Sequence, residues 1–322
     1  MKKTIKRLFS RAALTLTLFL FTSVTAWAET INTSYKDADG TIKYIDATVI
    51  TEGGYSTTSS TTLDAGWYVV TGSDVDFKGS LQCPGDLHLI LADGAKMTVT
   101  HTASERGIYV SGTLTIYGQA AGTGELVASA TKRNGIYAVG DLTINGGKIY
   151  ASTTANSACA ISTNTNTGNI TINGGDITAA GTMYGINAGY NLTINGGKVH
   201  ATHTQQGGEG LRGKNSMTLG YTNIDDEIYA DTYMSWYGGK VKDGQTLKDA
   251  DNNRYSGALT RNQITALKGK TLTPVYSVTY IDANGDLQQC YDFTVLTGST
   301  TYQSAVSPVW SVLVLPVSTV KS

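Results

Sequence analysis

Residues 142–152 read LTINGGKIYAS, and this stretch decides the fold. Apolar and polar residues alternate on both sides of its Asn-Gly-Gly centre, so Leu142 and Ile144 would face inward, whereas Thr143 and Tyr150 would face outward. A period of two is typical of β-strands, and glycine tolerates the positive φ angles that a sharp corner requires. The stretch therefore predicts two short strands joined by a tight turn.

The same word recurs along the chain and sets a period. Versions of it begin at Leu114, Leu142, Ile170, Leu192 and Met217. A second word recurs beside it, beginning at Gly107, Gly135, Ala160, Gly185 and Gly210, and in residues 135–138 it reads Gly-Ile-Tyr-Ala, a third alternating strand. Repeats of about 20 to 50 residues are typical of solenoids. We therefore expect an all-β chain that forms a right-handed parallel β-helix, with an N-terminal β-hairpin and a small C-terminal cap.

Two further patterns refine this architecture. Asn145, Asn173 and Asn195 occupy equivalent corners of successive coils, so we expect their amides to form a ladder. Residues 260–263 read Thr-Arg-Asn-Gln, a capping box that begins a helix in the cap, and Gly269 would end that helix after two turns.

The pattern divides the chain into five parts. We expect a signal peptide at 1–28, a β-hairpin at 29–58, the parallel β-helix at 59–233, a cap with a short helix at 234–276, and an incomplete second copy of the hairpin module at 277–322. The last expectation rests on the words Tyr-Lys-Asp-Ala-Asp-Gly and Tyr-Ile-Asp-Ala-Asn-Gly, which begin at residues 35 and 280.

The N-terminal segment has the order of charges expected of a secretion signal. Five basic residues precede an apolar run at 12–22, and Ala26-Trp27-Ala28 is a small-x-small cleavage pattern. The apolar run is too short to span a bilayer. Cleavage would leave a chain with a net negative charge, without the basic footprint of a nucleic-acid-binding protein. We expect a secreted or cell-surface protein with no membrane span after cleavage.

The chain resembles secreted, adhesin-like β-helix proteins of gut and oral bacteria, in which the words GWYVV, LTINGG and GKTLTP recur. Here GWYVV stands at residues 66–70 and GKTLTP at residues 269–274. More distantly, the chain is similar to pectate-lyase-like β-helices, some of which bind carbohydrate without cleaving it. The resemblance implies a surface role and affinity for polysaccharide, and it implies no catalytic residue in this sequence.

Few residues favour catalysis or metal binding. The outward positions of the LTINGG strands carry one acid, Asp141, which cannot supply a carboxylate pair, and Asp225-Asp226 is typical of a turn. His200 and His203 would face opposite sides of a strand. We therefore expect no enzyme activity and no cofactor. Three acidic loops, at residues 37–40, 249–253 and 282–286, leave weak calcium binding open.

Tyrosine is the most suggestive residue type, with 19 in the chain. Tyr109 and Tyr137 would occupy one outward column, with Tyr150 on the next strand a few ångströms around the coil, and aromatic faces stack on sugar rings. Trp236 and Tyr237 form a second aromatic pair, although the cap could bury both. Tyrosine is also favoured on strands for its β-propensity alone.

These residues lead to three hypotheses for the function. The first is an exported, non-enzymatic protein that binds polysaccharide or host glycan through Tyr109, Tyr137, Tyr150 and Trp236. The second is a structural or adhesin spacer without glycan affinity. The third is a polysaccharide lyase or hydrolase, which a cluster of acids with a base would favour.

Overall fold

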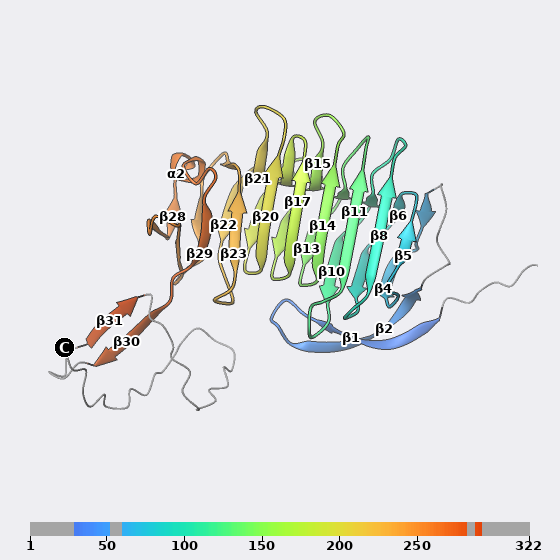
Figure 1. Ribbon diagram of the computed structural model, residues 1–322, viewed down its shortest axis with the longest axis horizontal. Coiled ribbons are helices and arrows are strands. Elements are labelled where there is room, and N and C mark those ends of the chain that lie inside the picture. Colours follow the sequence, from blue (N-terminus) through green and yellow to red (C-terminus); the bar gives the residue numbers. More distant parts are fainter. Residues whose placement is uncertain (1–28, 52–59, 282–286, 292–322) are drawn as a thin grey trace, which may run out of the picture.

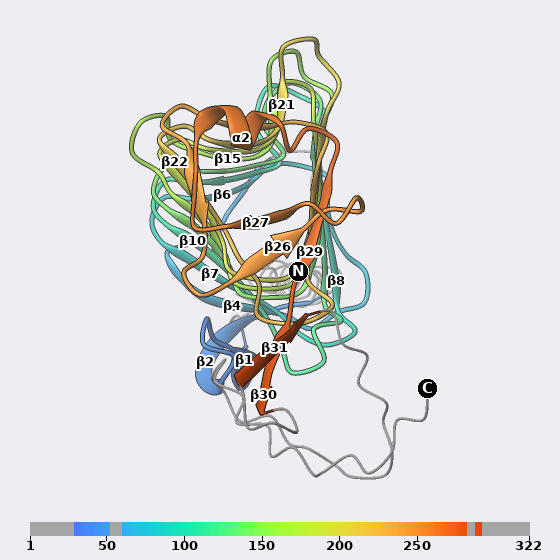
Figure 2. The same cartoon turned by 90° about the vertical axis from the view of Figure 1, so that its left-hand side faces the viewer.

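A computed structural model describes residues 29–51, 60–281 and 287–291, and it confirms the predicted all-β parallel β-helix. Three strands make each coil, and about seven coils stack along one axis. Equivalent strands of successive coils pair in parallel, so the coil has three sheets around a single core (Figures 1 and 2).

The first sheet has eleven strands and contains the LTINGG words. In spatial order its strands are β1 (Thr30–Lys36), β2 (Ile42–Ile50), β4 (Gly66–Val70), β7 (Leu87–Leu91), β10 (Leu114–Gly118), β13 (Leu142–Ile144), β16 (Ile170–Ile172), β19 (Asn191–Ile194), β22 (Ser216–Leu219), β25 (Gly239–Val241) and β28 (Ala258–Leu259).

The second sheet has ten strands and follows the Asn-Gly-Gly corners. In spatial order its strands are β27 (Arg254–Ser256), β26 (Thr246–Lys248), β29 (Thr271–Pro274), β23 (Glu227–Ala230), β20 (Lys198–His203), β17 (Asp176–Gly181), β14 (Lys148–Thr153), β11 (Glu125–Ala130), β8 (Lys96–His101) and β5 (Val75–Phe77).

The third sheet has eight strands and contains the Gly-Ile words. In spatial order its strands are β24 (Tyr233–Ser235), β21 (Glu209–Gly213), β18 (Tyr184–Ala188), β15 (Cys159–Thr163), β12 (Ile136–Ala138), β9 (Ile108–Val110), β6 (Leu81–Cys83) and β3 (Thr61–Thr62).

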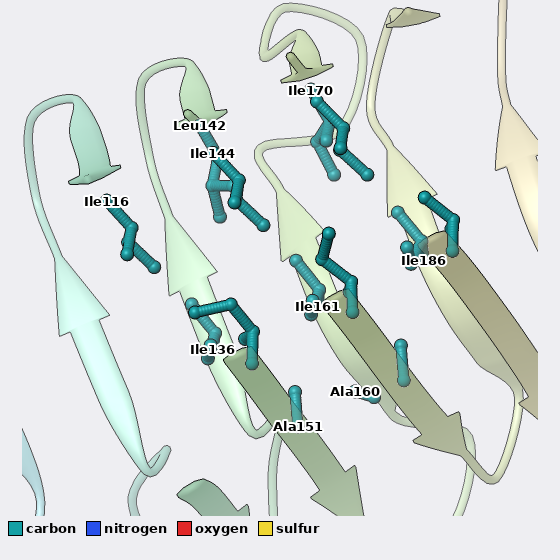
Figure 3. Packing of buried hydrophobic residues seen from close by; sticks show 14 of the residues in the cluster. Ile116, Ile136, Leu142, Ile144, Ala151, Ala160, Ile161, Ile170 and Ile186 are labelled. Atoms are coloured by element: carbon teal, nitrogen blue, oxygen red, sulfur yellow. The ribbon is translucent and has the colours of Figure 1, made fainter. Parts of the chain in front are cut away.

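Inward residues of the three sheets form one continuous core. Aliphatic side chains from successive coils lie directly above one another, as Ile116, Ile144 and Ile172 do in the register of their strands. Leu142 and Ile144 are fully buried, whereas Thr143 between them is partly exposed, so the predicted alternation is confirmed (Figure 3). Apolar burial along the axis is the main stabilising term of such a coil.

The corners after the LTINGG strands also agree with the prediction. The side-chain amide of Asn173 donates to Asn145 Oδ1 at 2.7 Å, and that of Asn195 donates to Asn173 Oδ1 at 2.8 Å. The second glycine of each Asn-Gly-Gly corner adopts a positive φ angle, for example +102° at Gly175. The amide ladder therefore satisfies polar groups at a corner where the strand ladder is interrupted.

An antiparallel hairpin, β1 with β2, precedes the coil, and β2 pairs in parallel with β4. Its apolar face covers part of the outer surface of the eleven-stranded sheet and makes a second, smaller cluster around Trp67 and Tyr117. Trp67 stacks on His88 with ring centroids 4.2 Å apart. A second antiparallel hairpin, β30 (Ser277–Ile281) with β31 (Leu287–Tyr291), follows the cap.

The C-terminal cap covers the last coil, although parallel pairing continues through β25, beyond residue 233. Helix α2 (Arg261–Thr265) packs against β24 and starts with the predicted capping box, in which Thr260 and Gln263 bond each other's backbone amides. The prediction that Gly269 ends the helix is wrong. The helix ends at Thr265 because Ala266 caps it, and Gly269 serves a later turn with φ +69°.

None of the described residues belongs to a helix of the length and apolar character needed to cross a membrane.

Candidate functional site

The outer face of the eight-stranded sheet is the candidate functional site, and two tyrosines mark one end of it. Tyr137 on β12 lies in register with Tyr109 on β9, as their outward positions predict. Their rings stack with centroids 6.0 Å apart and an angle of 21° between the planes. Strands in parallel register therefore bring together two aromatic rings that are 28 residues apart in the sequence.

Arg106 completes this first cluster, although no sequence pattern singles it out. Its guanidinium carbon lies 4.8 Å from the ring centroid of Tyr109 and 4.2 Å from that of Tyr137. Arg106 Nε is buried and has no hydrogen-bond partner among the described residues. The two ring faces are partly covered by this cation, so the phenol hydroxyls and the guanidinium are the polar groups presented to a ligand.

A second arginine–aromatic cluster lies further along the same face. Arg212 on β21 lies over the ring of Tyr184, 4.7 Å from its centroid, and 5.8 Å from the ring centroid of Trp236. The ammonium of Lys214 is 5.3 Å from the same Trp236 ring. Trp236 is 48% exposed and Tyr237 is 81% exposed, so the cap buries neither of them.

Buried polar side chains lie between the two clusters. Ser162 on β15 and Asn187 on β18 occupy the column that runs from Tyr137 to Arg212. Asn134 donates to Ser162 Oγ at 2.6 Å, and Arg212 donates to Asn187 Oδ1 at 3.5 Å. Tyr109 and Arg212 are four strand spacings apart, or about 19 Å at ~4.8 Å per strand.

We call this surface the arginine–aromatic strip. It comprises Arg106, Tyr109, Asn134, Tyr137, Ser162, Tyr184, Asn187, Arg212 and Trp236.

Tyr150 does not belong to the strip, so the prediction that it lies beside Tyr137 is wrong. Tyr150 is on β14 of the ten-stranded sheet, where it is 39% exposed and in register with Val127 and Thr178. Between Tyr137 and Tyr150 the chain passes through β13 of the eleven-stranded sheet and then turns a corner. Alternation indicates which residues face outward, but it does not indicate which of three outer faces they share.

Glu209, at the edge of the strip, was missed by the sequence analysis, and His203 beside it was considered only as a metal ligand. Glu209, at the start of β21, has a carboxyl oxygen that is buried without a partner among the described residues. Burial raises the pKa of Glu209, although the charges of Arg212 and His203 oppose that rise. His203 Nδ1 lies 2.9 Å from Asp231 Oδ1, and its backbone amide donates to Asp231 Oδ2 at 2.7 Å. A carboxyl group with a raised pKa is a usual feature of general acids.

Neither cysteine of the described coil is exposed. Cys83 and Cys159 are both buried and free. Burial raises the pKa of the Cys159 thiol to about 11, which leaves it protonated at neutral pH. The third cysteine, Cys290, is on β31.

The acidic loops are organised by protein donors. Asp249 accepts hydrogen bonds from Lys270, from the side chain of Asn253 and from Tyr255. Burial acts to raise the pKa of Asp249, but these hydrogen bonds outweigh it and hold the pKa below its usual range. Asp226 accepts from the backbone of Thr222 and thus forms the turn predicted for it.

The other two acidic loops considered for calcium binding lie at residues 37–40 and 282–286. Asp37 pairs with Lys43, and Asp39 accepts from Thr41. The loop at 282–286 lies outside the described residues. Within the described part of the chain, no group of three or more His, Cys, Asp or Glu side chains is arranged to hold a metal ion.

Comparison with known proteins adds no assignment to this geometry. No family model, curated protein or solved structure matches the chain. The function must therefore be argued from the surface of the coil itself.

Proposed function

We propose that the protein is exported and binds an extended polysaccharide or host glycan along the arginine–aromatic strip, without cleaving it. The observation that supports this most directly is the placement of two arginine–aromatic clusters at the ends of one polar strip about 19 Å long. Two clusters that far apart suit an extended ligand better than a compact one.

Each part of the strip has a chemical task in this proposal. Trp236, nearly half exposed, offers an apolar ring to a sugar face. Asn134, which is partly exposed, offers its side-chain amide to sugar hydroxyls, and the two arginines offer guanidinium donors. Ser162 and Asn187 are buried, and their hydrogen bonds position Asn134 and Arg212. Tyr109 and Tyr137 contribute mainly their hydroxyls and ring edges, because Arg106 covers part of their faces.

A lyase or hydrolase is the second candidate, and Glu209 is the observation that favours it. Its raised pKa would suit a proton donor. Glycoside hydrolysis needs a second carboxyl group, however, and Asp231 is engaged by both the ring and the backbone of His203. We therefore keep the non-enzymatic proposal.

A polysaccharide pull-down and a glycan array with the purified protein test the proposal. We expect retention on at least one polysaccharide, and an affinity about tenfold lower for Trp236→Ala and for Tyr109→Ala combined with Tyr137→Ala, corresponding to ~1.4 kcal/mol. Tyr150→Ala and Tyr44→Ala are matched controls, because these exposed tyrosines lie on the ten-stranded sheet and on the hairpin. Both should leave retention unchanged.

The contrary outcomes are distinct. No retention on any polysaccharide would leave the spacer hypothesis in front. Release of new reducing or unsaturated ends from a retained polysaccharide, abolished by Glu209→Gln, would make the strip an active site. Export is tested separately by sequencing the N-terminus of protein recovered outside the cytoplasm, which should begin at Glu29.

A further inference from the structure

The ten-stranded sheet carries a column of charges that alternate in sign on six successive strands, from β8 to β23. The strand register places these side chains in one line: Lys96, Glu125, Lys148, Asp176, Lys198 and Glu227. We call this line the charged column. Four of its members are exposed and two are partly exposed.

Most of the charge in this column is free to bind elsewhere. Lys96 Nζ lies 2.7 Å from Glu125 Oε1, and in the described structure no other neighbouring pair of the column comes within 4.0 Å. Asp74, which precedes β5, continues the alternation next to Lys96 but lies outside the strand. Partly satisfied charges on a flat sheet can gain a partner at little desolvation cost, because they remain near water.

An alternating column of even length has a geometric property that a uniform column lacks. If a second copy is placed face to face and turned by a two-fold axis that runs along the strands, its column runs in the opposite direction. Lys148 then opposes Asp176 of the other copy, Glu125 opposes Lys198, and Lys96 opposes Glu227. Each contact occurs twice, as an isologous interface requires.

The other face-to-face two-fold arrangement is disfavoured by the same charges. An axis along the coil would place every residue of the column against its own counterpart, so lysine would meet lysine and carboxylate would meet carboxylate. Like charges in direct opposition are unfavourable, and such a pattern selects orientation more than it adds affinity.

Shape agrees with this register. Tyr150 lies beside the column, two residues after Lys148 on β14, and is exposed. The antiparallel arrangement places it opposite Thr178 of the other copy. Thr178 lines a shallow hollow of about 350 Å³, together with Asp176, Lys198, Val199, His200 and Glu227. Each copy would therefore insert one tyrosine into the hollow of the other.

We propose that the outer face of the ten-stranded sheet binds a second copy of this chain in antiparallel orientation, through the charged column and Tyr150. This inference is independent of glycan binding, because it uses a different sheet.

The area of the ten-stranded sheet that the dimer would bury indicates how tightly the two copies should bind. Six strands about 4.8 Å apart, each up to six residues long at ~3.3 Å per residue, give about 500 Å² per copy. A total near 1,000 Å² falls among weak and transient complexes. The dimer should therefore be concentration-dependent, and salt should weaken it because the Debye length falls from about 10 Å at 0.1 M to about 3 Å at 1 M.

Sedimentation velocity of the purified protein tests the proposal. The parent should dimerise at low salt and dissociate at high salt. Lys148→Glu and Asp176→Lys should each weaken dimerisation tenfold or more, because each places two like-charge pairs in the interface. Lys240→Glu, a charge reversal at an exposed strand position of the eleven-stranded sheet, should leave dimerisation unchanged.

The exchange variant Lys148→Glu/Asp176→Lys is decisive. It restores opposite charges between copies, yet within one chain it puts Glu125 beside a glutamate and Lys198 beside a lysine. Recovery of the dimer therefore supports the interface. A parent that stays monomeric, or an exchange variant no better than the single variants, would overturn the proposal and reduce the column to an intramolecular ladder.

Discussion

The second glycine of each Asn-Gly-Gly corner combines two requirements at one residue. Gly175 has φ +102°, and a Cβ atom built on it would lie 2.7 Å from the carbonyl oxygen of Gly147 in the preceding coil. Gly197 repeats this relation to Gly175 at 2.7 Å. The corner therefore needs glycine for its backbone angle and also for the close stacking of coils.

We expect Gly175→Ala to destabilise the protein by about 3 kcal/mol or more, because strain and a backbone clash add. Gly207→Ala is the matched control, since Gly207 has φ +79° but open space where a Cβ would lie. That variant should cost only about 1 to 2 kcal/mol. Urea unfolding measures both, and equal losses would show that stacking at the corner contributes nothing.

At the scale of the elements, the hairpin of β1 and β2 depends on an aromatic cluster that contains a histidine. His88 stacks on Trp67 and its Nδ1 lies 3.3 Å from the hydroxyl of Tyr117. Burial lowers the pKa of His88, although the charge of Asp86 opposes this. The neutral ring is thus the form that the folded state prefers.

Stability should consequently fall as the pH is lowered. The unfolded chain takes up the His88 proton first, at a pKa of about 6.5, so the contribution is present above that pH and is lost as the pH falls towards the lower pKa of the folded state. Urea unfolding between about pH 7.5 and pH 5 should show a smaller loss for His88→Gln than for the parent. Equal losses would place the pH dependence on other groups.

The strands and corners also show which features of the fold the sequence could predict. Alternation and the Asn-Gly-Gly corners predicted the strands, the inward residues and the amide ladder, because these depend on neighbours one or two residues away or one coil away. The site was predicted only in part. Tyr109 and Tyr137 share a column through equal positions in one repeat, but Tyr150 was misplaced because the angle between sheets is set by the whole coil.

Arg106, Arg212 and Glu209 could not be found in this way. Arg106 precedes its strand and reaches across two coils, so no fixed spacing links it to the rings that it covers. Glu209 is distinguished by burial rather than by its neighbours in the sequence. A signal was nevertheless present, since Cys159, Tyr184 and Glu209 occupy equivalent positions of three successive coils.

At the scale of the whole molecule, the coil has to be closed at its C-terminal end. Helix α2 lies across the end of the core, with Ile264 fully buried, and Tyr233 is buried beneath it. Without this cap the last coil would expose both apolar side chains and unpaired strand edges, which favour aggregation.

Ile264→Asp tests the cap. We expect it to lower the free energy of unfolding by about 3 to 5 kcal/mol and to increase light scattering on warming, because a charge would be buried at the end of the core. Asn262→Asp adds the same charge at an exposed position of the helix and should change neither property. Normal solubility of the Ile264 variant would mean that the helix is dispensable as a cap.

Every coil adds one residue to each outward column. Whether the number of charged residues in a column is even or odd therefore decides which charges meet when two copies pair. The charged column has six members of alternating sign, and reversal of an even series places opposite signs together. Addition of one coil at an end of the column, with a residue of the next sign in the alternation, would make the series odd, and at full overlap each charge would then meet its like. Duplication of two coils would restore the match. Change in length by whole repeats, which a solenoid tolerates readily, would thus switch self-association off and on without altering a single fold contact inside the coil.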